Sequence, residues 1–244
     1  MMLETNPSKW LLIYSFCLVF SCNSRNNRII YDDENGGTGE IEEDSTRIPS
    51  VKLPVLFDST DVILHPVIMV ETERRMKGID FGSGSYSSYE YGGVYDEFDQ
   101  ITGDITNIIF ELKDSVSYTL TDENLLISSL RYLRRIYRAT GNQYLLYNVR
   151  DSDSNGNKEF DYQDLESLYI SRLNGTEFKK LTPDMHDFHD SKLIPELNRF
   201  YYITQEDINK DGTLDKTDLF HYYFIQFTKE GYTVEEYNPY ENLE

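Results

Sequence analysis

Short apolar runs alternate with polar turns along most of the chain, and the pattern repeats. Three segments share one plan, in which a β-rich run, a short turn with a charge or glycine, and a second β-rich run follow each other: 107–122, 167–184 and 221–239. Two further apolar runs precede each segment: 62–70 and 94–98, then 125–133 and 144–149, then 192–197 and 199–204. Runs of this length, rich in Tyr, Ile, Val and Phe, favour β-strands. The pattern predicts three units of four antiparallel strands.

One of these segments also has a family resemblance. The run LYISRLNGTEFKKLTPD (168–184) resembles the repeat of periplasmic Tol-type propellers, in which a strand ends in an Asp/Asn-Gly turn and the next closes on Leu-Thr. The same Leu-Thr ending occurs at residues 120–122 (Leu-Thr-Asp), whereas residues 236–238 (Glu-Tyr-Asn) lack it. The resemblance covers roughly residues 60–240. It implies an all-β fold of three four-stranded antiparallel blade-like repeats, that is, a partial β-propeller.

Three units are fewer than the four to eight blades of a closed propeller. A partial propeller, a stacked set of sheets and a ring completed by another chain therefore remain open.

The amino end reads as a targeting signal. Lys9 precedes an apolar stretch of 12 residues, Trp10–Ser21, and Cys22 follows it. A membrane-spanning helix needs about 20 apolar residues, so this stretch fits the core of a secretory signal better. It resembles the bacterial lipoprotein signal, in which the cysteine carries fatty acyl chains such as palmitate and becomes the first mature residue. We therefore expect a signal peptide at 1–21 and lipidation at Cys22.

The residues after that cysteine are polar and acidic. Residues 22–50 combine charge and glycine with little apolar surface, which predicts a flexible tether, and residues 51–244 form the β-repeat domain. Acidic residues near a lipidated cysteine also resemble the surface-export signals of lipoproteins in the Bacteroidota. The expected location is the outer membrane, with the protein lipid-anchored on its periplasmic or cell-surface side.

A segment near the carboxyl end has the spacing of a calcium loop. Side-chain oxygens recur at loop positions 1, 3, 5, 9 and 12 with glycine at position 6, which is the arrangement that wraps a short chain around Ca²⁺. The segment resembles the loops of EF-hands, and more closely those of dockerins, since position 12 is an aspartate. The expected ligands are Asp207, Asn209, Asp211, Thr213 through its carbonyl, Asp215 and Asp218.

A second segment matches the first half of that pattern. It places Asp151 at position 1 and Gly156 at position 6, and two extra residues then precede its second half. The expected ligands are Asp151, Asp153, Asn155, Asp161 and Asp164. We therefore predict two Ca²⁺ sites, of which the Asp207–Asp218 loop is the stronger. Both loops lie between strands rather than helices, which favours hairpin tips held by structural calcium over a switching helix pair.

The net charge and the absence of common catalytic motifs limit the classes of function that the sequence supports. Asp+Glu 43 against Lys+Arg 23 gives a formal charge of −20, which disfavours nucleic acid and anionic lipid surfaces. The chain has no serine nucleophile elbow and no phosphate-cradling glycine loop. We expect a calcium-binding envelope lipoprotein that is a binding or assembly module and not an enzyme, attached to the membrane through its lipid, with an envelope protein or glycan as partner. The alternative is a glycan-acting envelope hydrolase that uses surface carboxylates.

The lipid anchor gives a direct test. Cys22→Ser should abolish labelling of the protein by a radioactive or clickable fatty acid, because the substitution removes the thiol that is acylated. Cys17→Ser is the matched control and should keep the labelling, since Cys17 lies within the part that is cut away. Labelling that persists in the Cys22→Ser protein would contradict the anchor.

Overall fold

The computed structural model describes residues 29–31, 47–71, 99–113 and 117–241. The expected signal peptide, Cys22 and most of the expected tether lie outside these ranges. The strands are β1 (Arg47–Val51), β2 (Val55–Leu56), β3 (Val62–Glu71), β4 (Gln100–Leu112), β5 (Tyr118–Thr119), β6 (Leu126–Tyr132), β7 (Tyr144–Arg150), β8 (Ser167–Arg172), β9 (Lys179–Lys180), β10 (His186–Ile194), β11 (Arg199–Glu206), β12 (Leu219–Phe227) and β13 (Tyr232–Glu236). Two short helices, α2 (Arg134–Thr140) and η2 (Pro195–Leu197), interrupt them.

The strands form two open antiparallel sheets. The larger has nine strands in the order β1-β3-β4-β6-β7-β8-β9, with β2 beside β3 and β5 beside β4. The smaller is the meander β10-β11-β12-β13. The path of the larger sheet turns at the long strand β4, because residues 100–105 pair with β6 whereas residues 105–112 pair with β3. The all-β, antiparallel class expected from the sequence is confirmed.

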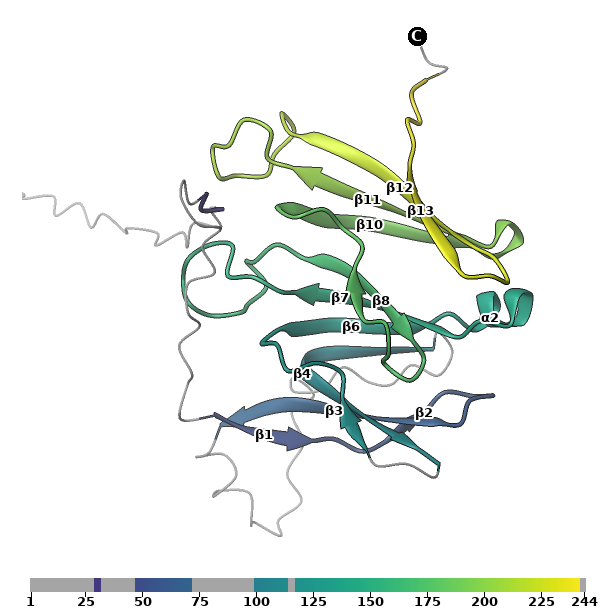
Figure 1. The fold of residues 1–244 in the computed structure, drawn as a ribbon. Helices are drawn as coiled ribbons and strands as arrows, with labels where there is room; N and C mark the ends of the chain where they lie inside the picture. Colours follow the sequence, from purple (N-terminus) through teal and green to yellow (C-terminus); the bar gives the residue numbers. More distant parts are fainter. Residues whose placement is uncertain (1–28, 32–46, 72–98, 114–116, 242–244) are drawn as a thin grey trace, which may run out of the picture.

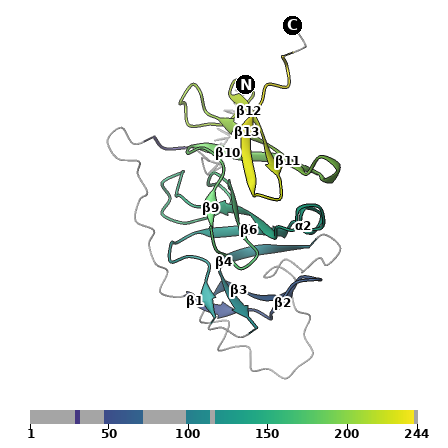
Figure 2. The same cartoon turned by 45° about the vertical axis from the view of Figure 1, so that its right-hand side comes forward.

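The sheets stack in layers. Figure 1 has β1–β3 at the bottom, β6–β8 in the middle and β10–β13 at the top, and the same order holds in the turned view of Figure 2. β7 is the central strand of the stack and is buried on both faces. Its residues Leu145, Tyr147 and Val149 belong to a core shared with β3, β4 and β6, and the alternate residues Tyr144 and Leu146 belong to a second core. A strand buried on both faces reads as one continuous apolar run, as YLLYNV does here.

The second core joins the two sheets. Phe200 and Tyr202 of β11 and Ile225 and Phe227 of β12 pack in it against β7 and β8. Tyr144 contacts Phe227 with ring centroids 5.4 Å apart. Burial of this aromatic and aliphatic surface holds the top layer on the middle one.

Two elements differ from the sequence expectation. Helix α2 follows β6 directly, and its Ile136 is fully buried in the second core, so tertiary packing selects a helix where the sequence offered no clear period. β10 begins at His186 rather than near residue 192, where the sequence pattern placed the apolar run, so residues 186–191 form the first part of a strand. Pairing of that part with β11 supplies its backbone hydrogen bonds.

The boundaries of the domain also extend upstream of the expected start. β1 begins at Arg47, within the range expected for the tether, and pairs with β3 along its length. Within the described part of the chain, no helix has the length and apolar character needed to cross a membrane.

Two glycines with the same backbone conformation give a test of the core packing. Gly175 has φ +80°, and a Cβ added there would lie 2.8 Å from Cδ2 and Cζ of the buried Phe110. Gly141 has φ +81° and nothing within 4 Å of such a Cβ. Gly141→Ala should cost about 1–2 kcal/mol of unfolding free energy from the left-handed backbone alone. Gly175→Ala should cost about 1–3 kcal/mol more, because Phe110 must move.

Urea denaturation of the two variants measures the difference. Equal destabilisation of the two proteins would mean that the turn at Gly175 does not rest on Phe110.

Candidate functional site

The two acidic loops leave their sheets on the same side of the molecule. One connects β7 to β8 and the other connects β11 to β12. In Figure 1 both project to the left, and the short purple segment 29–31 lies between them. Each loop joins the second and third strand of a run of four, β6–β9 or β10–β13, so the stacking of the sheets places the loops together.

The loop before β12 is organised by the carboxylate of Asp207, which is 3% exposed. Its two oxygens accept hydrogen bonds from the backbone N–H groups of Asp211, at 3.3 Å, and Gly212, at 2.7 Å. Asn209 Oδ1 accepts from Asp211 N at 2.8 Å, and Asp211 Oδ1 accepts from Thr213 N at 2.9 Å. In these bonds the side-chain oxygens at loop positions 1, 3 and 5 accept from backbone N–H groups two to five residues ahead, and the chain is thereby folded into a compact turn.

The second half of this loop returns to the same place. Asp218 is 7% exposed, and its Oδ2 accepts from Asp215 N at 2.7 Å. Its Oδ1 is buried and has no hydrogen-bond partner in the described structure. Hydrogen bonds from the hydroxyl and the backbone N–H of Thr217 lower the pKa of Asp215, which stays ionised. The six expected ligand residues of this loop therefore lie on one turn. The last of them, Asp218, has a buried carboxylate oxygen that accepts no hydrogen bond in the described structure.

The loop before β8 repeats this network in a different register from the one expected. Asp153, which is 5% exposed, takes the part of Asp207. Its oxygens accept from Asn157 N at 3.1 Å and Lys158 N at 2.7 Å, four and five residues ahead, as in the other loop. Asn155 Oδ1 accepts from Asn157 N at 2.9 Å, as Asn209 does from Asp211. Position 1 of this loop is thus Asp153.

The closing half matches as well. Asp164 Oδ2 accepts from Asp161 N at 3.0 Å, and Asp161 Oδ1 accepts from Gln163 N at 2.7 Å. Asp218 and Asp215 make the same two contacts in the other loop. The loop therefore runs over twelve residues, 153–164, without the two-residue insertion that the sequence suggested.

Backbone conformation explains why the sequence suggested the wrong register. Both loops have left-handed residues at positions 4 and 6: Gly156 and Lys158 in one, and Lys210 and Gly212 in the other, with φ between +57° and +83°. Glycine and lysine have exchanged places between the loops. An alignment on glycine at position 6 therefore shifts the first loop by two residues and makes Asp151 its first member.

Asp151 lies outside the loop network. Its carboxylate accepts from Tyr169 Oη at 2.7 Å and Ser167 Oγ at 3.2 Å, and it pairs with Lys180 Nζ at 2.9 Å. These partners belong to β8 and β9, so Asp151 fastens the end of β7 to the neighbouring strands. When Asp153 is position 1, Asn157 occupies position 5 and Glu159, through its carbonyl, occupies position 7.

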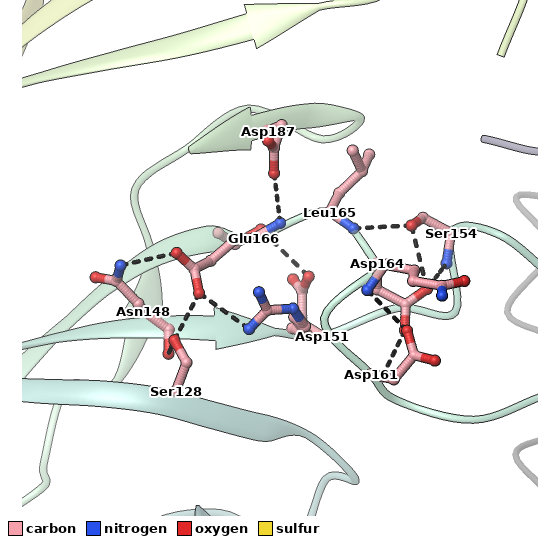
Figure 3. Close-up of polar contacts among 12 residues, drawn as sticks. Ser128, Asn148, Asp151, Ser154, Asp161, Asp164, Leu165, Glu166 and Asp187 are labelled. Atoms are coloured by element: carbon pink, nitrogen blue, oxygen red, sulfur yellow. Dashed lines mark hydrogen bonds and ion pairs between the residues drawn. The ribbon is translucent and has the colours of Figure 1, made fainter. Parts of the chain in front are cut away.

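The exit of the first loop is fixed by buried polar contacts (Figure 3). Ser154 N donates to Asp164 Oδ1 at 2.9 Å, and Ser154 Oγ accepts from Leu165 N at 2.8 Å. Burial raises the pKa of Asp164, and backbone hydrogen bonds oppose the rise only in part. The uncompensated burial means that ionised Asp164 gains from any nearby cation.

Glu166 then anchors the start of β8, as Figure 3 also shows. Its carboxylate accepts from Ser128 Oγ at 2.5 Å, Asn148 Nδ2 at 2.8 Å and Arg150 at 3.0 Å. Its backbone N–H donates to Asp187 Oδ1 at 2.7 Å, and Asp187 lies on β10. This contact links the exit of the first loop to the second sheet.

The segment 29–31, which we call the strap, bridges both loops. Ile29 N donates to the Gly212 carbonyl at 2.7 Å, and Ile30 N donates to the Ser154 carbonyl at 2.8 Å. Ile29 is 6% exposed, and the Ile30 side chain covers Gly156, where an added Cβ would meet its Cδ1 at 2.5 Å. The strap therefore couples the loops, which lie far apart in sequence.

Tyr31 completes the strap on the side of the second loop. Its hydroxyl hydrogen-bonds to the carboxylate of Asp207, and its ring lies 6.0 Å from Lys210 Nζ. Burial and the adjacent carboxylate raise the pKa of Tyr31, so it remains a neutral donor. Sequence reasoning missed the strap because it lies in an acidic stretch, and the only local signal is the Ile-Ile-Tyr triplet.

Comparisons with known proteins were made for the whole chain. No protein-family profile matches it, and no curated protein matches its sequence. A weak structural neighbour is the structure of a protein described as putative TolB from Agrobacterium tumefaciens, with 13% sequence identity and a TM-score of 0.30. The match covers 72% of this chain and spans 60% of that one.

The strap gives a prediction about the loops. Ile29→Ser should release the segment, since burial of an isoleucine side chain contributes about 1.5–3 kcal/mol. Hydrogen exchange at the unsubstituted amide of residue 30 should then become about ten- to hundredfold faster. Ile30→Ser is the control, because Ile30 is 54% exposed, and it should change exchange at the amide of residue 29 much less. Equal effects of the two substitutions would contradict docking through Ile29.

Proposed function

We propose that the chain is a lipid-anchored, calcium-binding protein of the Gram-negative envelope, of the Bacteroidota type, and that its β-repeat domain is a binding or assembly module without a catalytic step. The observation that carries the proposal is that the two twelve-residue loops have the same pattern of hydrogen bonds to buried carboxylates. A protein or glycan of the envelope is the proposed partner.

The choice of calcium follows from the donors. Each loop offers carboxylate, amide and carbonyl oxygens and no nitrogen or sulfur ligand, and Ca²⁺ takes six to eight oxygens. Buried carboxylates repel each other and are costly without a compensating charge. Asp218 Oδ1, buried and without a donor, is the atom that a bound cation would satisfy. The proposed ligands of the first loop are Asp153, Asn155, Asn157, the Glu159 carbonyl, Asp161 and Asp164, and those of the second are Asp207, Asn209, Asp211, the Thr213 carbonyl, Asp215 and Asp218.

Blade-like units remain the proposed description of the repeats. Strands β6–β9 and β10–β13 are each four consecutive antiparallel strands, and in each set the acidic loop joins the second strand to the third. Strands β3, β4 and β5, with β1 or β2 at the edge, would supply a first unit. This assignment accounts for the equal placement of the two loops.

Docking of the strap limits how far the domain can lie from a lipid anchor at Cys22. If Cys22 is lipidated, only six residues (23–28) lie between it and Ile29, and the seven residue-to-residue steps span at most about 25 Å. The loops would therefore lie close to the lipid surface, and bound calcium would fix the orientation of the domain on the membrane.

An aromatic face on the outer layer supports the binding role. The rings of Tyr222 and Tyr237 lie 6.1 Å apart, those of Tyr222 and Tyr240 5.7 Å apart, and those of Tyr201 and Tyr237 5.7 Å apart. Tyr240 is 54% exposed. Tyrosine is enriched at interfaces because its ring is apolar and its hydroxyl remains a polar contact.

Thermal unfolding tests the calcium sites. Calcium should raise the melting temperature of the full-length protein, with each site contributing about 2.7 kcal/mol when free ion is 100-fold above its dissociation constant. Combining Asp153→Asn with Asp207→Asn should remove most of that gain. The variant should fold without calcium but be less stable than the wild type, because asparagine keeps the shape of the side chain and one acceptor oxygen, whereas the second backbone N–H loses its acceptor.

Asp151→Asn is the matched control. It removes an aspartate two residues from Asp153 that pairs with Lys180 rather than with the loop. The calcium-dependent gain should survive this substitution even if the protein loses some stability without calcium. No gain in the wild type, or a gain that depends on Asp151 and not on Asp153, would contradict the proposal.

A further inference from the structure

A cluster of nitrogen and oxygen ligands lies at the end of β11, directly before the second loop, and shares no residue with the proposed calcium ligands. His186 of β10, Glu206 of β11 and His221 of β12 each place one ligand atom within 4.8 Å of the others. The strand register produces the cluster. His186 is paired with Glu206, and His221 is paired with Thr204, two residues from Glu206 on the same face of the sheet.

Both histidines turn the same ring nitrogen toward the glutamate. His221 Nε2 lies 2.8 Å from Glu206 Oε2, and His186 Nε2 lies 3.8 Å from the same oxygen. The two imidazole rings have centroids 4.7 Å apart. Two nitrogens and a carboxylate thus converge on one point, and Glu206 is 41% exposed, which leaves that point open to solvent.

The other ring nitrogen, Nδ1, lies within hydrogen-bond distance of a side-chain oxygen in each histidine. His221 Nδ1 lies 3.0 Å from Glu236 Oε1, and His186 Nδ1 lies 2.9 Å from Oγ1 of the fully buried Thr204. Partners of this kind fix the tautomer and the ring orientation of metal-binding histidines. Glu236 and Thr204 thus hold the two rings with Nε2 turned toward Glu206.

The identity of an ion bound at this point follows from the ligands. We propose that His186 Nε2, His221 Nε2 and a Glu206 carboxylate oxygen bind a Zn²⁺ ion, with water in the remaining position. Two imidazoles and one carboxylate are a ligand set that zinc takes with an open fourth position. Calcium prefers oxygen alone, so this centre and the loops select different ions.

A titration with Zn²⁺ tests the site. The full-length protein, without a histidine tag, is titrated in excess Ca²⁺ so that the loop oxygens are saturated. One equivalent of Zn²⁺ should bind, and the side-chain NMR signals of His186 and His221 should shift while those of His65 and His189 stay in place. This readout uses the wild-type protein, so it does not depend on the folding of a variant.

Substitutions identify the ligands. Glu206→Gln should weaken Zn²⁺ binding at least about tenfold, because the neutral amide is a poor ligand. His65→Gln is the matched control and should leave binding unchanged, since His65 pairs with Glu111 at 2.8 Å and belongs to no metal-binding group among the described residues.

Two results would overturn the proposal. One is the absence of saturable Zn²⁺ binding in excess calcium, with His221 carrying protons on both nitrogens between Glu206 and Glu236. The other is zinc binding that survives Glu206→Gln.

Discussion

The organisation of this molecule depends on aspartate carboxylates buried at the tips of two loops. Asp153, Asp164, Asp207 and Asp218 are all 7% exposed or less. A buried carboxylate requires donors or a cation, and backbone N–H groups of the same loop supply donors to all of these oxygens except Asp218 Oδ1. The loop conformation, the left-handed residues at positions 4 and 6 and the docking of the strap all follow from arranging the chain around those oxygens.

The stacked sheets bring the two loops together. β7 packs on both of its faces, and the aromatic core between it and β11–β12 holds the second sheet on the first. Because each loop joins equivalent strands of its run, the stacking leaves the loops on one side, where Ile29 and Ile30 hydrogen-bond to one loop each. The proposed calcium sites thus lie beside the segment that leads back to the proposed lipid anchor.

The sequence predicted those features that depend on local spacing. The apolar runs indicated an antiparallel β fold, and the spacing from Asp207 to Asp218 predicted a loop register that the hydrogen bonds of Asp207 and Asp218 also follow. The first loop was harder because backbone conformation, and not residue type, defines positions 4 and 6, and lysine occupies position 6 there. Helix α2 depends on the burial of Ile136, which a local pattern does not reveal. The His186–Glu206–His221 cluster depends on cross-strand register, since its members come from three strands.

Calcium stoichiometry tests the central claim most directly. Isothermal titration calorimetry on the full-length protein, stripped of metal by a chelator, counts the ions that bind. The account predicts two equivalents of Ca²⁺ per chain, one for each twelve-residue loop, with one equivalent remaining in Asp153→Asn. Saturation at fewer than two equivalents in the wild-type protein, or no heat of binding, would contradict it.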